Sequence, residues 1–580
     1  MLRDEFKQLS AIFAVFFCCV TAGAYDFKVG EIFYNITSET ELTVEVTYES
    51  WSAADGYVSS YTGDIVIPSA VVCNGKNYTV TAIGRNAFAG CVNVASLSVP
   101  GSVTNVYDYA FKNCTSLSKL RLEDDSTMLS FGCNPSEHQG LFNDCPLESL
   151  YLGRNFEYGQ PYGTSHTTSP FNQQDALTSV TIGNSVTDIC MYAFSYCTAL
   201  QNVTIPGSVK NLGHGAFYKC SGLTSISIPE SVKSMHDYLF DGCTALKSVT
   251  LPNSIAVIPY AAFRDCTSLT AISIPMSVVE LEGYAFVNCN SLRSITIPNN
   301  VKTIGPDAFC NCEKLLSVYI GDGVSEIGDR AFIYCEYLKN VTFGKGLKTI
   351  GESAFENCCM VEKLTLPDSL TIIGARAFMG CEILSEIFIP ERVKEISRDA
   401  FSYTALEEVT IGAGVELIGP DAFYMCEKLK TVVIGKSVKT IKEDAFDGCE
   451  AVTSIYSHIP ADSLCEVLER AFGGIDKNSC VLYVPKGAVN KYSTTRGWRD
   501  FFNIMEFEST AIDDVIKDTE ISVTANGVSV AGRECEAVAI YAANGALVVR
   551  INEFEGGEIL LDKGVYIVRV GNKTTKVVIE

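Results

Sequence analysis

The stretch AFVNCNSLRSITIPNNVKTIG, residues 285–305, contains a short run in which polar and apolar residues alternate. Successive side chains of an extended strand point to opposite faces, so Ile295 and Ile297 are predicted to face a core and Thr296 to face outward. Pro298 has no N–H to donate to a neighbouring strand and is expected to end this one. The pattern predicts one strand followed by one return segment.

The same pattern recurs along the chain, and its most regular member is a phenylalanine that usually follows an alanine. From Phe171 to Phe401 every interval between these phenylalanines is 23 residues. A period in the low twenties is typical of a leucine-rich-repeat solenoid, whose units pack only against their neighbours. The sequence therefore predicts a β-rich solenoid with a parallel sheet. The repeat phenylalanines are Phe88, Phe111, Phe142, Phe171, Phe194, Phe217, Phe240, Phe263, Phe286, Phe309, Phe332, Phe355, Phe378, Phe401, Phe423, Phe446 and Phe472.

The charge balance limits the kind of partner. The 580 residues carry a formal net charge of −24. Proteins that bind nucleic acid draw much of their affinity from Lys and Arg that neutralise phosphates, so no nucleic-acid partner is expected. An acidic surface favours solubility, and we expect a monomer.

The first 24 residues have the layout of a signal peptide. Arg3 and Lys7 precede an apolar run over residues 11–20, and the small residues 22–24 suit cleavage after Ala24. No later stretch approaches the roughly 20 apolar residues of a membrane helix. We therefore expect an exported chain that is secreted or held at the cell surface and is not transmembrane.

A lipoprotein signal at Cys18 or Cys19 is the weaker alternative. Bulky Phe16 and Phe17 stand where such a signal has small residues.

The wording AFxxCxxLxxIxIPxxVxxIG resembles the BspA-like class of leucine-rich repeats, which occurs in surface and secreted proteins. The flanking sequences YDFKVGEIFYNITSETELTVEVTY and LYVPKGAVNKYSTTRGWRDFFNIMEF resemble the N-terminal β cap and the closing segment of that family. The resemblance implies binding to another macromolecule. The expected domains are a signal peptide over 1–24, an N-terminal β cap over 25–80, the solenoid over 81–480 with long-loop repeats over 112–171, a C-terminal cap over 481–508 and a small β-sandwich over 512–580.

The tail changes pattern after residue 508. AVAIYAANGALVVRI predicts two strands joined by an Asn544-Gly545 turn, and GVYIVRVGNKTTKVVIE predicts a second hairpin around residues 571–573. The segments GVYIVRV and KTTKVVIE resemble the C-terminal sorting domain of type IX secretion substrates. That resemblance implies passage across an outer membrane.

Of the 24 cysteines, 14 stand three residues after a repeat phenylalanine. One cysteine per unit makes a line along the solenoid, whereas a zinc site needs a local cluster of ligands. Disulfides between adjacent units are an alternative in an exported protein. Thr404 and Gln174 fill the same position in two units, which favours a small, buried, reduced side chain. Cys465 and Cys480 lie outside the series, and a disulfide between them would close a loop in the C-terminal cap.

No catalytic motif, metal-binding motif or cofactor fingerprint is found, so neither an enzyme nor a cofactor is expected. His214 and His236 lie in successive repeats, and we interpret them as surface or partly packed residues. An alternative is an envelope-associated hydrolase or carbohydrate-processing accessory that uses the loops of residues 121–172 with His138 or His166. A passive structural spacer is a third reading.

The outward position in the middle of each predicted strand is mostly Ser or Thr, as at Thr296, Thr342 and Thr365. Tyr319 and Phe388 interrupt this column, and exposed aromatic residues are frequent binding anchors. Arg293, Lys339 and Lys247 recur at the first outward strand position. This face is the predicted contact surface. The family resemblance implies a non-catalytic adhesion protein whose partner is a host or microbial surface protein or a glycan.

Overall fold

The computed structural model describes residues 24–54, 56–134, 139–159, 167–507 and seven strands between residues 520 and 579. The chain divides into two compact units, one formed by Met1–Thr453 and Cys465–Asp476 and the other by Ser454–Leu464 and Lys477–Glu580. The predicted signal peptide lies almost entirely outside the described residues.

The first unit begins with a β cap. Strands β1 (Phe27–Val29), β2 (Ile32–Ser38) and β3 (Thr43–Thr47) pair antiparallel in that order, and β3 pairs parallel to β8 (Lys76–Ile83). Strand β7 (Ala70–Cys73) pairs with the other part of β8, and β8 also pairs with the first short strand of the repeats. The cap therefore closes the end of the solenoid.

A separate hairpin projects from this cap. It consists of β4 (Ser50–Ser52) and β5 (Gly56–Val58), in which Trp51 pairs with Tyr57.

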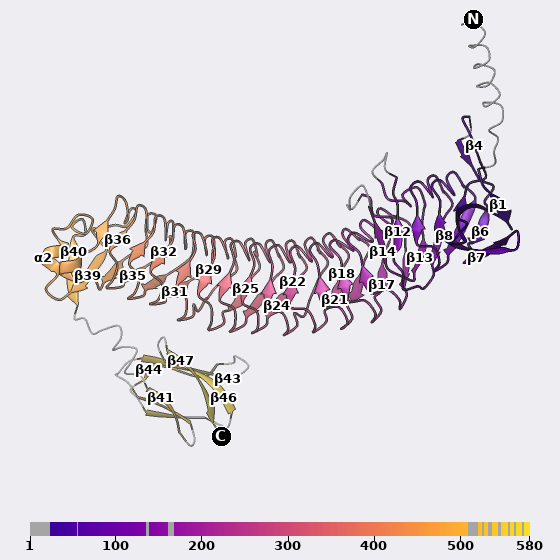
Figure 1. Cartoon of the computed structure of the whole chain (residues 1–580). Helices are drawn as coiled ribbons and strands as arrows, with labels where there is room; N and C mark the ends of the chain where they lie inside the picture. Colours follow the sequence, from indigo (N-terminus) through magenta and orange to yellow (C-terminus); the bar gives the residue numbers. More distant parts are fainter. Residues whose placement is uncertain are drawn as a thin grey trace, which may run out of the picture. The chain divides into compact units, whose positions relative to one another are not determined.

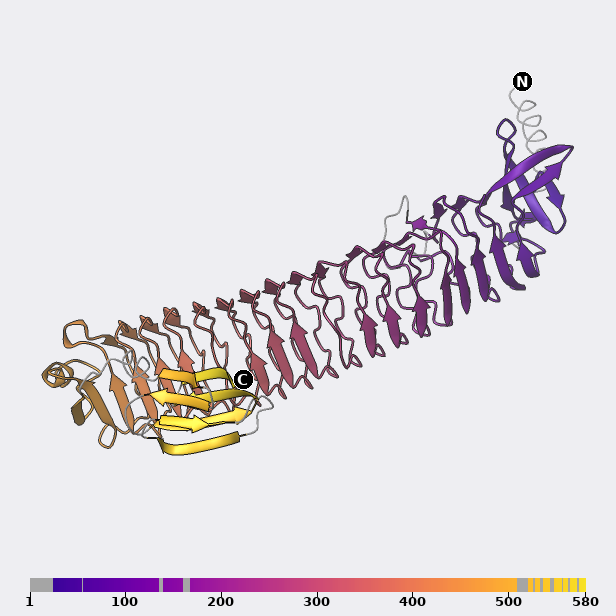
Figure 2. The ribbon, with the colours of Figure 1, turned by 90° about the horizontal axis from the view of Figure 1, so that it is seen from below.

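The repeats of the first unit stack in sequence order, with their longer strands side by side along one face (Figures 1 and 2). We call these strands the long-strand sheet. It has two interruptions, at residues 271–274 and 363–366, and all its pairs are parallel. Its strands are β6 (Gly63–Val66), β9 (Val94–Val99), β11 (Lys119–Leu122), β13 (Ser149–Leu152), β15 (Ser179–Ile182), β17 (Asn202–Thr204), β19 (Ser225–Ser227) and β21 (Ser248–Thr250), then β24 (Ser294–Ile297), β26 (Ser317–Ile320) and β28 (Asn340–Thr342), then β31 (Glu386–Ile389), β33 (Glu408–Ile411) and β35 (Thr431–Ile434).

Each repeat also contributes a second strand, and the expectation of a single strand per unit was wrong. In the repeat of residues 285–305 it is β25 (Thr303–Ile304), where Ile304 is buried. A two-residue strand shows no alternation in sequence, so its apolar residue was assigned to the return segment.

These short strands form a second series of parallel sheets. They are β10 (Asn105–Val106), β12 (Leu129–Phe131) and β14 (Phe156–Tyr158), then β16 (Asp188–Ile189), β18 (Asn211–Leu212) and β20 (Ser234–Met235), then β22 (Val257–Ile258), β23 (Glu280–Leu281), β25, β27 (Glu326–Ile327), β29 (Thr349–Ile350), β30 (Ile372–Ile373), β32 (Glu395–Ile396), β34 (Leu417–Ile418), β36 (Thr440–Ile441) and β38 (Glu466–Val467).

The core between the two series is a continuous stack of the repeat phenylalanines. The ring centroids of Phe309 and Phe332 are 5.1 Å apart with planes 2° from parallel, and Phe355 follows at 5.1 Å and 8°. All three side chains are buried. The regular spacing in the sequence is therefore the spacing of one ring per turn.

The backbone turns sharply on both sides of each phenylalanine. Tyr284 and Asn288, which flank Phe286, have φ of 60° and 58°, and equivalent residues in other repeats are also left-handed. The N–H of Phe286 donates to the carbonyl of Ala308 in the next repeat at 2.7 Å. We call the side of the solenoid that these turns form the turn edge.

The second unit contains β37 (Ser454–Ser457), β39 (Val481–Pro485) and β40 (Asn503–Phe507) in a parallel sheet, the 3-10 helix η1 (Ala461–Ser463) and the short helix α2 (Val489–Tyr492). The buried Tyr492 hydroxyl donates to the Ile459 carbonyl at 2.8 Å. The Tyr492 ring also packs edge-on against the buried Trp498, with ring centroids 5.2 Å apart.

The tail of the second unit forms two antiparallel sheets, as expected for a small β-sandwich. One contains β41 (Glu520–Thr524), β42 (Gly527–Ala531) and β45 (Gly557–Leu560), and the other β43 (Glu536–Ala542), β44 (Leu547–Phe554), β46 (Gly564–Val570) and β47 (Lys573–Ile579). The predicted pairing of β43 with β44 and of β46 with β47 is confirmed, and the turn residues 543–546 and 571–572 lie outside the described residues.

Candidate binding surface

The outward column of the long-strand sheet is aligned by parallel pairing. Thr296 of β24 is in register with Tyr319 of β26, which is in register with Thr342 of β28. All three side chains are exposed, and the Tyr319 ring is 44% exposed. Their strand neighbours Ile295 and Val318 are buried, so the alternation in sequence places the column on the solvent side.

Phe388 lies on a later segment of the same face. It belongs to β31, is 42% exposed and pairs with Thr410. Thr365, in the repeat between, is exposed but stands in the interruption at residues 363–366, where Lys363 and Glu386 form an isolated bridge. Tyr319 and Phe388 therefore stand on two sheet segments and not on one continuous sheet.

Further large apolar side chains accompany these two. Leu316 is 39% exposed, Tyr337 54% and Ile383 38%, and each lies just before or within the turn that enters β26, β28 or β31. We call Leu316, Tyr319, Tyr337, Ile383 and Phe388 the apolar strand-face cluster. Large apolar side chains that are exposed to solvent are candidates for contact with a partner.

The predicted cations lie one residue outside the strands. Arg293 precedes β24 and Lys339 precedes β28, so their expected place at the first outward strand position is corrected by one residue. The backbone N–H of each residue donates a hydrogen bond to the preceding repeat, and that of Lys339 donates to the Leu316 carbonyl at 3.0 Å. Both side chains are exposed, and both residues stand directly before the start of their strands.

An aromatic column on the turn edge was missed by sequence reasoning. Five rings from successive repeats contact one another in the order Tyr192, His214, Tyr238, Tyr260 and Tyr284, with centroids 5.1 to 5.4 Å apart. All are partly exposed. The signal was weak because the aromatic residue shifts by one position between repeats, from Tyr238 to Tyr260.

His214 is packed inside this aromatic column. Burial lowers the pKa of His214, and its ring lies between those of Tyr192 and Tyr238. Over the part of the chain that the structure describes, no group of three or more His, Cys, Asp and Glu side chains could hold a metal ion.

From Asp307 onward, charged residues take the place of the rings on this edge. Arg330 donates to both oxygens of Asp307, at 3.0 and 2.7 Å, and Arg398 pairs with Asp421 at 2.8 Å. Salt bridges between consecutive repeats therefore join the second half of the turn edge.

The long-loop repeats are anchored by a buried arginine. Arg154 is fully buried and donates to the carbonyls of Gly101 at 2.7 Å and Pro100 at 2.9 Å. Burial lowers its pKa. These bonds attach the described part of this insertion to residues 100–101, while His138 and His166 lie outside the described residues.

The ladder cysteines are packed as expected. Cys289 and Cys312 are fully buried, and each thiol donates to a phenylalanine carbonyl of the preceding repeat at 3.3 and 3.2 Å. Both are free thiols, so the packing interpretation is confirmed for them. The pairing of Cys465 with Cys480 stays a prediction.

Comparison with known proteins adds the family. The model of the BspA type leucine rich repeat region matches six copies, over residues 75–134, 164–270, 257–371 and 348–475, which together cover more than half of the chain. No curated protein matches the chain.

Several solved structures are similar. A leucine-rich repeat protein from Bacteroides ovatus is 23% identical, with 83% of this chain and 100% of that chain covered and a TM-score of 0.46. A leucine rich cell surface protein from Faecalibacterium prausnitzii is 23% identical over 74% and 94% of the two chains, with a TM-score of 0.33. The leucine rich repeat protein of T. pallidum is 32% identical over 27% and 76%, with a TM-score of 0.26.

Proposed function

The chain belongs to the BspA-type leucine-rich repeat family, and from that premise we propose that it is a non-catalytic adhesion protein. It binds another surface protein through the apolar strand-face cluster. The observation that carries this proposal is the exposure of Tyr319 and Phe388, at 44% and 42%, in a column where Ser and Thr are the rule.

The chemistry of this face favours a protein partner. Specific protein interfaces combine a few exposed aromatic or aliphatic anchors with a polar rim, and bury about 1,600 Å² in total. The cluster supplies the anchors, and Arg293 and Lys339 supply charged groups at the border. Parallel pairing holds the strand backbone that carries Tyr319 and Phe388, which limits the conformational entropy lost on binding.

The proposal places the protein outside the cell. The signal-peptide layout of residues 1–24 and the resemblance of the tail to a sorting domain support secretion or surface attachment. Among the described residues, no helix is long and apolar enough to cross a membrane.

A binding screen with matched variants tests the proposal. The chain is tested against immobilised extracellular matrix proteins and glycans, as wild type, as Tyr319→Ala/Phe388→Ala and as Tyr334→Ala/Tyr403→Ala. Tyr334 and Tyr403 are 45% and 46% exposed but stand in turns, with φ of 59°, so they control for the loss of an exposed aromatic ring.

We expect the strand-face variant to bind the partner about tenfold or more weakly, because aromatic anchors each contribute about 2 kcal/mol at interface centres. The turn variant is expected to bind as wild type does. Equal binding by all three proteins would refute the strand-face site, and a chain without any ligand in the screen would favour the passive spacer.

A further inference from the structure

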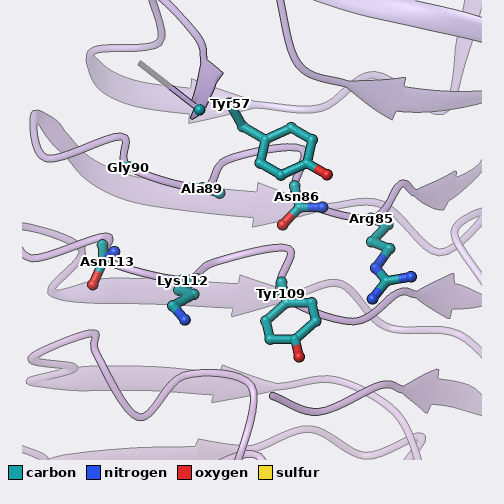
Figure 3. A pocket seen from close by; sticks show the side chains of 9 residues that line it. Tyr57, Arg85, Asn86, Ala89, Gly90, Tyr109, Lys112 and Asn113 are labelled. Carbon is teal, nitrogen blue, oxygen red and sulfur yellow. The ribbon is translucent and has the colours of Figure 1, made fainter. Parts of the chain in front are cut away.

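A cavity at the N-terminal end of the first unit has a lining unlike the rest of this acidic chain. It has a volume of about 480 Å³ and lies between the β4–β5 hairpin and the first two repeats (Figure 3). Its lining contains two cations, Arg85 and Lys112, two tyrosines, Tyr57 and Tyr109, and two asparagines. None of the described residues that line it is acidic. A chain with a net charge of −24 needs such a local concentration of cations to hold an anion.

The two cations are grouped around one ring. The guanidinium of Arg85 lies 5.3 Å from the centroid of Tyr109, and the ammonium of Lys112 lies 5.5 Å from it. Figure 3 shows the Tyr109 ring between these two side chains. A ring in contact with both cations restrains them in the cavity wall, which lowers the entropy lost when a ligand binds.

Two described carboxylates, one beside Tyr109 in the chain and one bonded to Asn113, accept hydrogen bonds from backbone groups. Asp108 accepts a hydrogen bond from the N–H of Cys133 at 3.1 Å, and Asp144 accepts one from the N–H of Asn113 at 3.0 Å. Neither carboxylate lines the cavity. Asp108 and Asp144 are therefore engaged by backbone N–H groups and are not part of the lining.

Tyr57 provides a second aromatic surface opposite the repeats. It is 40% exposed, packs edge-on against Tyr48 at 4.9 Å and pairs with Trp51 across the hairpin. The hydroxyl of Ser59 donates to the carbonyl of Ala87 at 3.3 Å, which ties the end of the hairpin to the first repeat. The distance between the hairpin and the repeats is thus set by the fold.

The backbone of the repeat side is equally fixed. Asn86, Tyr109 and Asn113 have φ of 60°, 58° and 59°. The N–H of Gly90 donates to the Lys112 carbonyl at 2.8 Å, and that of Tyr109 to the Cys133 carbonyl at 3.2 Å. Hydrogen bonds between repeats therefore hold the backbone of the lining residues Gly90 and Tyr109, so this wall of the cavity is formed before a ligand arrives.

We propose that this cavity is a binding site for a carboxylated pyranose, the acidic sugar unit of a glycan chain. An arginine fork accepts a carboxylate in a bidentate geometry, the tyrosine faces pack against the C–H face of a sugar ring, and asparagine amides bond to hydroxyls. The volume lies within the roughly 300–1,000 Å³ of small-ligand sites. A phosphate alone would leave both tyrosine rings without a role.

The test is a calorimetric titration of the full chain. The probes are a glucuronate-containing oligosaccharide, 3′-sialyllactose, lactose as the neutral sugar and inorganic phosphate, each at low and high salt. The variants are Arg85→Gln and, as a matched control, Arg121→Gln. Arg121 also lies over a tyrosine, with its guanidinium 3.9 Å from the Tyr151 centroid, but outside the cavity.

We expect at least one acidic sugar to bind wild type and the Arg121→Gln variant with equal affinity. The Arg85→Gln variant should bind that sugar about tenfold or more weakly. Binding to wild type should weaken at high salt. Whether the uronate or the sialic acid binds identifies the source of the sugar. Equal binding of lactose, equal binding of phosphate, an equal loss in both arginine variants or no binding of either acidic sugar would each overturn the proposal. The Tyr319→Ala/Phe388→Ala variant should keep this binding, so the result is independent of the strand-face site.

Discussion

The thiol of Cys289 donates a hydrogen bond to the carbonyl oxygen of Phe263 in the preceding repeat, at 3.3 Å. The same bond joins each of 12 other ladder cysteines to the phenylalanine one repeat earlier, at 3.0 to 3.6 Å. The cysteine is thus a small apolar residue with one weak donor, and it satisfies a carbonyl that the turn leaves inside the core.

The ladder thiols are expected to be unreactive in the folded protein. Burial raises the pKa of Cys312 well above its ordinary value, whereas Cys310, two residues earlier and only partly buried, has a pKa raised to about 11. Iodoacetamide should therefore modify Cys310 before Cys312 in the native state and both after unfolding. Mass spectrometry of peptides prepared without reductant identifies the modified cysteines. Extensive disulfides between ladder positions would contradict the packing interpretation.

Removal of one stacked ring is expected to destabilise the solenoid strongly. Phe332→Ala creates a cavity between Phe309 and Phe355, at a cost of about 3–5 kcal/mol in the free energy of unfolding. Phe388→Ala, which removes an exposed ring, should cost less than about 0.5 kcal/mol. Urea denaturation compares the two, and similar values would show that the stack does not support the core.

Arg264 is expected to stabilise a buried carboxylate. Its guanidinium lies 2.5 Å from Asp241, whose side chain is 1% exposed and whose pKa is raised by burial. Arg264→Ala leaves the charge of Asp241 without its partner, and we expect a loss of about 3 kcal/mol at neutral pH. Lys363→Ala, which breaks the exposed pair with Glu386, should cost at most about 1 kcal/mol.

The sign of the pH dependence checks that interpretation. Protonation removes the buried charge, and an acid whose folded pKa is raised gives up stability as pH rises through that pKa. The deficit of Arg264→Ala should therefore shrink as pH is lowered from about 7 toward about 4. A deficit that stays constant over this range would show that lost packing, and not the charge of Asp241, is its cause.

His214 is expected to reduce stability under acidic conditions. Burial lowers its pKa in the folded state, so the unfolded chain takes up the proton first, and stability falls as pH drops below about 6.5. His214→Phe keeps a ring between Tyr192 and Tyr238 and should lose less stability than wild type between about pH 7 and pH 5. The same loss of stability in His214→Phe and wild type over this range would contradict this interpretation.

Sequence alone was sufficient for features that repeat with a constant period. The interval of 23 residues predicted the solenoid, and the alternation around Thr296 predicted which residues face solvent. It could not show the second strand, because Thr303 and Ile304 are too few to alternate. The long-strand sheet also has an interruption at residues 363–366, although LTLP there resembles the wording of the paired strands.

The N-terminal cavity could not be predicted from the sequence for a different reason. Tyr57 belongs to the cap, whereas Arg85 and Tyr109 belong to the first two repeats, and only the fold brings them together. The repeat period places Asn86 beside Tyr109, which follows 23 residues later, but no spacing in the chain places Tyr57 near them. The same holds for Arg154, whose partners Pro100 and Gly101 lie more than fifty residues away.

The most direct measurement of the strand-face proposal is hydroxyl-radical footprinting of the chain alone and with the matrix protein that it binds. Oxidation of Tyr319 and Phe388 is expected to fall several-fold on binding, because an interface covers aromatic anchors. Oxidation of Tyr334 and Tyr403, which are equally exposed but stand in turns, should not change. Protection of Tyr334 and Tyr403 with unchanged oxidation of Tyr319 and Phe388 would contradict the account.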